Sequence, residues 1–130
     1  MAISVVFNLN NRFNNRELGA LGENLVISIL KEKGCAILRQ NFRSRYGEID
    51  IVAKDRGSIV FIEVKTRKST RYGTPEEAVD LRKQKQLRLM ALHYLSKHFT
   101  PSAGYRFDVY SILLNKDNQP ESIKVLENCF

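Results

Sequence analysis

The sequence predicts an α/β domain in which helices flank a central mixed β-sheet. Apolar residues recur at helical spacing in two segments, whereas shorter runs rich in Val, Ile and Phe have the pattern of strands. The predicted order is αβββαββ, and hairpin strands followed by a helical crossover give both antiparallel and parallel neighbours in one sheet. We expect a single domain at residues 16–130, preceded by a flexible leader at 1–15.

The first helix is expected at residues 15–33, with Gly34 in the position of a C-terminal glycine cap. Its apolar residues recur every three to four positions and cover much of its circumference. Glu23 does not lie on the wet side, because Val26 and Leu30 share its face of the helix. The pattern therefore places a carboxylate against the body of the protein.

Three strands are expected after the first helix. The chain there predicts a short strand and a basic bend, and two further strands at 49–53 and 59–64 flank a turn signal at 54–58. A hairpin loop of either two or four residues gives the same register, in which Asp55 pairs with Ser58.

The second helix is signalled by a capping box at residues 74–77 and is expected to run, with a break near Asp80, to about His98. Strands at 105–114 and 121–130, separated by a polar turn, complete the predicted order.

The chain is strongly basic. Lysine and arginine outnumber aspartate and glutamate by 21 to 14, which gives a net charge of +7. A domain this basic suits nucleic acid, although a positive solvated surface explains the balance equally well. No apolar run approaches the roughly 18 residues of a membrane span, and no signal peptide is recognised. Cys35 and Cys129 match no metal-ligand spacing, so we expect reduced thiols in a cytoplasmic protein.

Acidic residues interrupt the two apolar strands of the hairpin. Continuing the register outward from the turn places Asp50 opposite Glu63, with Cβ atoms about 5 Å apart. Lys65 lies two positions beyond Glu63, and Glu48 lies two before Asp50, so all four are expected on one face. The same face is expected to carry the apolar residues Val52, Ile59 and Phe61.

Two carboxylates this close in a partly dry site repel each other and need a cation. Mg²⁺, for which Mn²⁺ substitutes, takes oxygen ligands and commonly binds through one or two carboxylates. We expect Asp50 and Glu63 to hold the metal, with Glu23 as a further ligand, directly or through water. Lys65 would orient or deprotonate the attacking water, or stabilise developing negative charge. Ion pairs at a sheet edge are the alternative, and Glu48 is left open as ligand or ion-pair partner.

Basic residues bracket the acidic cluster, with Phe42, Tyr46 and Tyr72 interleaved. Phosphate contacts supply most non-specific nucleic-acid affinity, and exposed aromatic rings stack on bases. Lys83 is one turn before a buried position of the second helix and is expected to point toward the site. Asp108 is interpreted as a buried, paired structural acid. The residues expected to contact nucleic acid are Arg43, Arg45, Arg67, Lys68, Arg71 and Lys83.

The order and spacing of several segments support a resemblance to a known family. They are "LGENLVISIL", "NFRSRYGEIDIVA", "IVFIEVKTR", "GTPEEAV" and "YRFDV". From Arg16 to Phe130 the chain is similar to the YraN-type family of uncharacterised bacterial proteins, within the PD-(D/E)XK nuclease-like superfamily. Restriction endonucleases and archaeal Holliday-junction resolvases belong to that superfamily, so the resemblance implies a restriction-endonuclease-like fold.

The resemblance also implies roles for individual residues. Asp50 takes the acidic metal-ligand role and Glu63 the second acidic role. Lys65 corresponds to the motif lysine and Glu23 to the acid on the first helix, while Ile49 stands where the superfamily name places proline. The residues expected to carry catalysis are therefore Asp50, Glu63, Lys65 and Glu23.

The leading hypothesis is a Mg²⁺-dependent endonuclease that hydrolyses phosphodiester bonds in DNA, with structured or branched DNA among the candidate substrates. The alternative is a non-catalytic nucleic-acid-binding module that keeps the nuclease-like fold. A third hypothesis is an adaptor that binds an acidic protein. A homodimer would suit cleavage of two strands, although no residue demands one.

Overall fold

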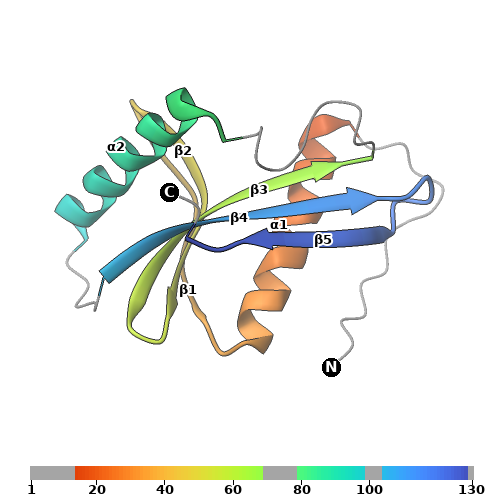
Figure 1. The fold of residues 1–130 in the computed structure, drawn as a ribbon, viewed down its shortest axis with the longest axis horizontal. Helices are drawn as coiled ribbons and strands as arrows, with labels where there is room; N and C mark the ends of the chain where they lie inside the picture. The colour runs from red at the N-terminus through yellow and green to blue at the C-terminus, as the bar shows by residue number, and fades with distance from the viewer. Residues whose placement is uncertain (1–13, 69–78, 99–103, 129–130) are drawn as a thin grey trace.

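A computed structural model describes residues 14–68, 79–98 and 104–128, and Figure 1 shows how the elements are arranged. Helices and strands follow one another in the predicted order. The elements are α1 (Asn15–Glu32), β1 (Ala36–Ser44), β2 (Gly47–Asp55), β3 (Ser58–Arg67), α2 (Leu81–Lys97), β4 (Gly104–Leu114) and β5 (Pro120–Leu126).

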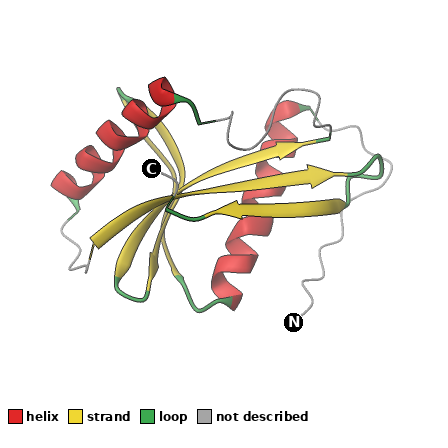
Figure 2. Cartoon of the chain, in the orientation of Figure 1, coloured by secondary structure: helices red, strands yellow, loops and turns green. Residues whose placement is uncertain are grey.

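The strands form one sheet in the spatial order β1-β2-β3-β4-β5 (Figure 2). Neighbours are antiparallel except β3 and β4, which are parallel and are separated in the chain by α2. Parallel neighbours need a long crossover connection, which is why a helix falls between these two strands. The predicted mixed sheet is confirmed.

Each face of the sheet packs against a different helix. Because strand side chains alternate between faces, Ile51 and Ile62 join the buried cluster on the α1 side, whereas Val52 and Phe61 join the one on the α2 side. In Figure 1, α1 lies behind the part of the sheet made by β3, β4 and β5, and α2 lies beside β2. A site where β2 and β3 separate can therefore receive side chains from both helices.

Several element boundaries differ from the predicted ones. β2 and β3 extend beyond the expected strands at 49–53 and 59–64. The segment expected to be a basic bend is part of β1. It resembles a bend in sequence because β1 is an edge strand whose arginines are exposed to solvent. The last strand ends at Leu126 rather than at residue 130, and a turn follows it.

The second helix begins at Leu81, and Asp80 is its N-cap, accepting a 2.8 Å hydrogen bond from the backbone N–H of Lys83. The break expected near Asp80 is thus the start of the helix, while the capping box expected at 74–77 lies outside the described residues. The leader expected at 1–15 also lies outside them, except for Asn14 and Asn15, which cap and begin α1. Within the part of the chain that the structure describes, no helix has the length and apolar character that a membrane crossing needs.

Candidate functional site

The β2–β3 hairpin has the predicted register, with Asp55 opposite Ser58, but its ladder is one pair shorter than expected. The outermost pair is Ile51 with Ile62, so the expected pair of Asp50 with Glu63 does not form. Instead, Asp50 Oδ2 accepts a 2.8 Å hydrogen bond from the backbone N–H of Val64. A carboxylate thus takes the place of a strand carbonyl where the two strands separate.

The alternation of β2 is interrupted at this point. Ile49 and Val52 both pack in the cluster on the α2 side. In a regular strand, residues three positions apart lie on opposite faces of the sheet. The expectation that Asp50 shares a regular face with Val52 therefore does not hold. The neighbouring strand is irregular at the same level, because Asn41 of β1 has a positive φ of 51° and both Asn41 and Asp50 are missing from the β1–β2 pairing. Asn adopts this left-handed conformation more readily than most residues.

Glu23 reaches the same point from α1, as its helical position predicted. Its carboxyl group is close enough to Asp50 and to Glu63 for their charges and its own to influence one another. The sequence did not reveal a role for Asn41. With its amide nitrogen assigned to the side that faces the carboxylates, Asn41 donates to Glu48 Oε1 at 2.9 Å and to Glu23 Oε2 at 3.3 Å. The amide thus links two of the acidic residues.

A glycine lets α1 approach the sheet beside Glu23. A Cβ atom on Gly22 would lie 1.7 Å from Thr66 Oγ1 of β3, which is far inside van der Waals contact. The absence of a side chain at Gly22 therefore allows the close contact of helix and strand that brings Glu23 to the ends of β2 and β3.

Glu63 lies in the same region and is 6% exposed. Two lysines contact the same oxygen of its carboxylate: Lys65 Nζ is 3.4 Å and Lys83 Nζ is 3.6 Å from Glu63 Oε1. Lys65 comes from the same strand and Lys83 from the first turn of α2. Lys83 therefore points toward the acidic residues, as its position on the helix predicted.

The carboxyl groups perturb one another electrostatically. Burial, followed by the negative charge of Glu63, raises the pKa of Asp50 to about 7, and the hydrogen bond from Val64 opposes this shift. Burial, followed by the charge of Glu48, also raises the pKa of Glu23. Burial and the neighbouring carboxylates thus both disfavour the ionised forms of Asp50 and Glu23.

Glu48 lies at the solvent side of this group and forms an ion pair with Arg43, whose Nε is 3.5 Å from Glu48 Oε2. The arginine side chain is 75% exposed and the glutamate side chain 37% exposed, so the pair is weak. The ion-pair role for Glu48 is therefore observed, while a metal-ligand role stays open.

Of the other residues expected to contact nucleic acid, the structure describes Arg45, Arg67 and Lys68. Arg45 is exposed in the β1–β2 turn and donates a 2.8 Å hydrogen bond to the Tyr46 hydroxyl. Arg67 ends β3 and is followed by the exposed Lys68. Phe42 was expected among the aromatic residues available to bases, but it is buried against α2. Arg71 and Tyr72 lie outside the described residues.

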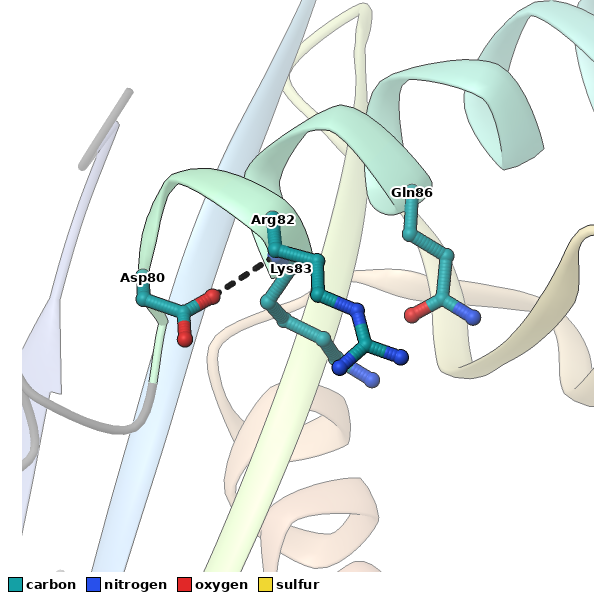
Figure 3. Close-up of a pocket in the computed structure, with 4 residues that line it drawn as sticks. All are labelled: Asp80, Arg82, Lys83 and Gln86. Carbon is teal, nitrogen blue, oxygen red and sulfur yellow. Dashed lines mark hydrogen bonds between the residues drawn. The ribbon is translucent and has the colours of Figure 1, made fainter.

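A polar cavity of about 390 Å³ adjoins Lys83 at the start of α2 (Figure 3). Figure 3 shows the Arg82 and Lys83 side chains extending in the same direction from the first turn. Gln86, which also lines the cavity, donates a 2.8 Å hydrogen bond to the backbone carbonyl of Tyr46 and so ties α2 to the β1–β2 turn. The sequence did not single out Arg82, because an exposed basic residue on a helix carries no signal of its own.

The donor atoms in the site suit Mg²⁺ by their chemistry. Among the described residues, no three or more His, Cys, Asp and Glu side chains are grouped as a ready metal-binding set. Mg²⁺ does not require such a set, since it keeps several waters and binds through one or two carboxylates. Asp50, Glu63 and Glu23 supply hard oxygen ligands. A cation would offset the burial and the repulsion from Glu63 that together raise the pKa of Asp50.

Asp108 lies away from this site and is 2% exposed. It accepts hydrogen bonds from Arg106 Nε at 3.2 Å and from the backbone N–H of Asn128 at 2.9 Å. Arg106 also bonds Asp55 at 2.9 Å and so joins β4 to the β2–β3 hairpin. The interpretation of Asp108 as a buried, paired structural acid is confirmed.

Fold and site together define an α/β domain with a cluster of carboxylates and lysines where two strands of a mixed sheet separate. The chain belongs to the uncharacterised protein family UPF0102, whose family model matches residues 22–112. A UPF0102 protein of Caldicellulosiruptor saccharolyticus is 41% identical over 117 residues, which cover 90% of this chain and 99% of the relative. A UPF0102 protein of Clostridium botulinum strain Hall is 44% identical over 117 residues, covering 89% of this chain and 95% of the relative.

These matches confirm the resemblance to the YraN-type family, while the place of that family in the PD-(D/E)XK superfamily stays a prediction. The matched stretch contains Glu23, Asp50, Glu63, Lys65 and Lys83.

Proposed function

We propose that the protein is a divalent-metal-dependent endonuclease that hydrolyses phosphodiester bonds in DNA. The observation that supports the proposal is that Glu23 of α1, Asp50 of β2 and Glu63 of β3 influence one another electrostatically where two strands separate. Two lysines contact the Glu63 carboxylate. Asp50 and Glu63 would hold the ion, and Glu23 would be a further ligand, directly or through water. Bound there, Mg²⁺ or Mn²⁺ would stabilise charge on the phosphate and lower the pKa of a coordinated water.

The protein groups have separate tasks in this proposal. Asp50 is oriented by the backbone of β3, because its Oδ2 accepts the N–H of Val64. Lys65 Nζ lies 3.4 Å from Glu63, and its side chain is 34% exposed, so it reaches both a metal ligand and solvent. We assign Lys65 to orienting or deprotonating the attacking water and to stabilising the developing charge.

Lys83 and Arg82 are assigned to the DNA backbone. Lys83 lies 3.6 Å from Glu63, and both basic side chains line the cavity at the start of α2. A phosphate next to the one being cleaved would be neutralised there. Arg43 and Arg45, which are exposed on β1 and the following turn, extend this basic surface. The net charge of +7 supports a polyanionic substrate, and the resemblance to DNA nucleases supports DNA.

A cleavage assay tests the proposal. Labelled single-stranded, duplex, flap and four-way-junction DNA are incubated with the full chain while Mg²⁺ or Mn²⁺ is titrated. We expect metal-dependent cleavage of at least one substrate, falling about 100-fold or more in Asp50→Asn, Glu63→Gln and Lys65→Met. Glu121→Gln, a matched exposed change on β5, should leave the rate unchanged. Equal cleavage by the parent and the Asp50 and Glu63 variants would refute the mechanism.

The second candidate is a non-catalytic nucleic-acid-binding module. It is favoured by one observation: two lysines already contact Glu63 Oε1, so this carboxylate has cationic partners without a metal. This candidate predicts salt-sensitive DNA binding with no metal-dependent turnover. Binding and cleavage measured in the same titration distinguish the two candidates, and Lys83→Met should weaken binding under either.

A further inference from the structure

The outward face of α2 carries large apolar side chains that no described part of the protein covers. Leu81 is 74% exposed, Leu92 58% and Leu89 48%. The inward face packs Leu87, Met90, Ala91 and Tyr94 into the core. At 100° per residue, Leu81, Lys85, Leu89 and Leu92 point away from that buried face. We call these four residues the α2 outer stripe.

The charged residues of α2 are all basic. The helix contains no acidic residue, and its basic residues are Arg82, Lys83, Lys85, Arg88 and Lys97. Lys85 lies between Leu81 and Leu89 on the stripe, and Arg88 lies at its edge. The surface therefore combines exposed leucines with positive charge along about 16 Å of helix.

We propose that the α2 outer stripe is a docking surface for an acidic, amphipathic helical segment of a partner protein. Such a segment offers apolar side chains to Leu89 and Leu92 and carboxylates to Lys85 and the basic residues beside it. A group of neighbouring exposed leucines on a helix is typical of a surface that binds a partner. The proposal is independent of nuclease activity, because Lys83 projects from the other side of the helix toward Glu63.

Other occupants fit the surface less well. A second copy would bring another α2 without carboxylates against the first, and each chain carries a net charge of +7. DNA phosphates would satisfy Lys85 but would gain nothing from the leucines. A lipid surface would need the leucines to enter the acyl region, and Lys85 lies among them rather than on an opposite polar face.

Fluorescence anisotropy with the full-length protein tests this proposal. The probe is a labelled peptide of about four helical turns, with leucines on one face flanked by glutamates. A second peptide has the same composition with the leucines scattered around the helix. We expect the first peptide to bind at least about tenfold more tightly than the second.

Variants on α2 then locate the binding surface. The double change Leu89→Gln and Leu92→Gln, and separately Lys85→Glu, should each weaken peptide binding about tenfold or more. Lys97→Glu reverses a charge on the same helix away from the stripe and should change binding less than about twofold. The four substituted residues, Lys85, Leu89, Leu92 and Lys97, are all exposed, so circular dichroism should show an unchanged fold. Equal binding of both peptides, or no weakening in the stripe variants, would overturn the proposal.

Separate arms test the other occupants with the same variants. They use phosphatidylserine-containing vesicles, duplex DNA, and sedimentation of the protein alone. Binding or self-association that is lost in the leucine variants, without specific peptide binding, would assign the stripe to lipid, DNA or a second copy and contradict the proposal.

Discussion

Asp50 Oδ2 accepts the backbone N–H of Val64 at 2.8 Å, one position beyond the last pair of the β2–β3 ladder. A strand that leaves a ladder exposes backbone donors that need partners, and here the side chain of the departing strand supplies one. The same bond fixes the direction of the carboxylate. The backbone of β3 therefore orients the Asp50 carboxylate without a bound ion.

Asp50→Asn should stabilise the protein at neutral and higher pH when no metal is present. The pKa of Asp50 is about 7 in the folded protein, above its ordinary value of 3.8. At pH values between these two, the folded state holds the Asp50 proton more tightly than the unfolded state. The contribution of Asp50 to stability is therefore most favourable at low pH and falls as pH rises toward 7. We expect the variant to gain on the order of 3 kcal/mol over the parent at pH 8, and much less at pH 4.

Urea unfolding in EDTA at several pH values measures this difference. Asp55→Asn is a control of opposite sign, because the hydrogen bond from Arg106 lowers the pKa of Asp55. Its removal should cost stability at neutral pH, and the loss should disappear as pH falls through the pKa of the folded state. A stability difference between the parent and Asp50→Asn that does not change with pH would contradict the assignment.

Gly22→Ala should destabilise the protein by about 1 to 3 kcal/mol, because the new Cβ would overlap Thr66 Oγ1 and force α1 and β3 apart. Gly19→Ala is the matched control in the same helix, since a Cβ there meets nothing within 4 Å. That change should stabilise by about 0.5 to 1 kcal/mol, as expected for alanine in a helix interior. Thermal denaturation of both variants measures the contrast, and equal effects would show that the Gly22–Thr66 contact is unimportant.

Arg106→Met should cost about 3 kcal/mol or more, because it leaves the buried Asp108 without its cation. Asp108→Asn keeps an acceptor for the Asn128 N–H and removes the charge. The double variant should therefore recover part of the loss. A double-mutant cycle in urea measures the coupling, and an Arg106→Met protein as stable as the parent would disprove it.

Local patterns predicted most of the fold. Helical periodicity located α1 and the inward position of Glu23, and the hairpin signal gave the register of Asp55 with Ser58. The length of β1 was underestimated, because arginines on an edge strand resemble a loop. The prediction that Lys83 points toward the acidic residues was confirmed. Its position relative to the buried stripe of α2 is a local property that the sequence shows directly.

The irregular centre of the site could not be predicted in the same way. Period-two alternation assumes a continuous ladder, and β2 departs from it at Asp50, where the side chain replaces a strand carbonyl. Asn41 was overlooked because its positive φ and its bonds to Glu48 and Glu23 depend on residues distant in sequence. An asparagine within an edge strand is a weak signal of such a distortion.

The most direct test of whether these acids form a metal site is to measure Mn²⁺ binding by titration calorimetry at pH 8. The proteins compared are the parent, Asp50→Asn and Glu63→Gln. At this pH Asp50, with a pKa of about 7, is mostly ionised. We predict a single Mn²⁺ per parent chain and at least about tenfold weaker binding in each variant, with parent affinity falling below pH 7. Identical isotherms for the three proteins, or no binding to the parent, would contradict the account.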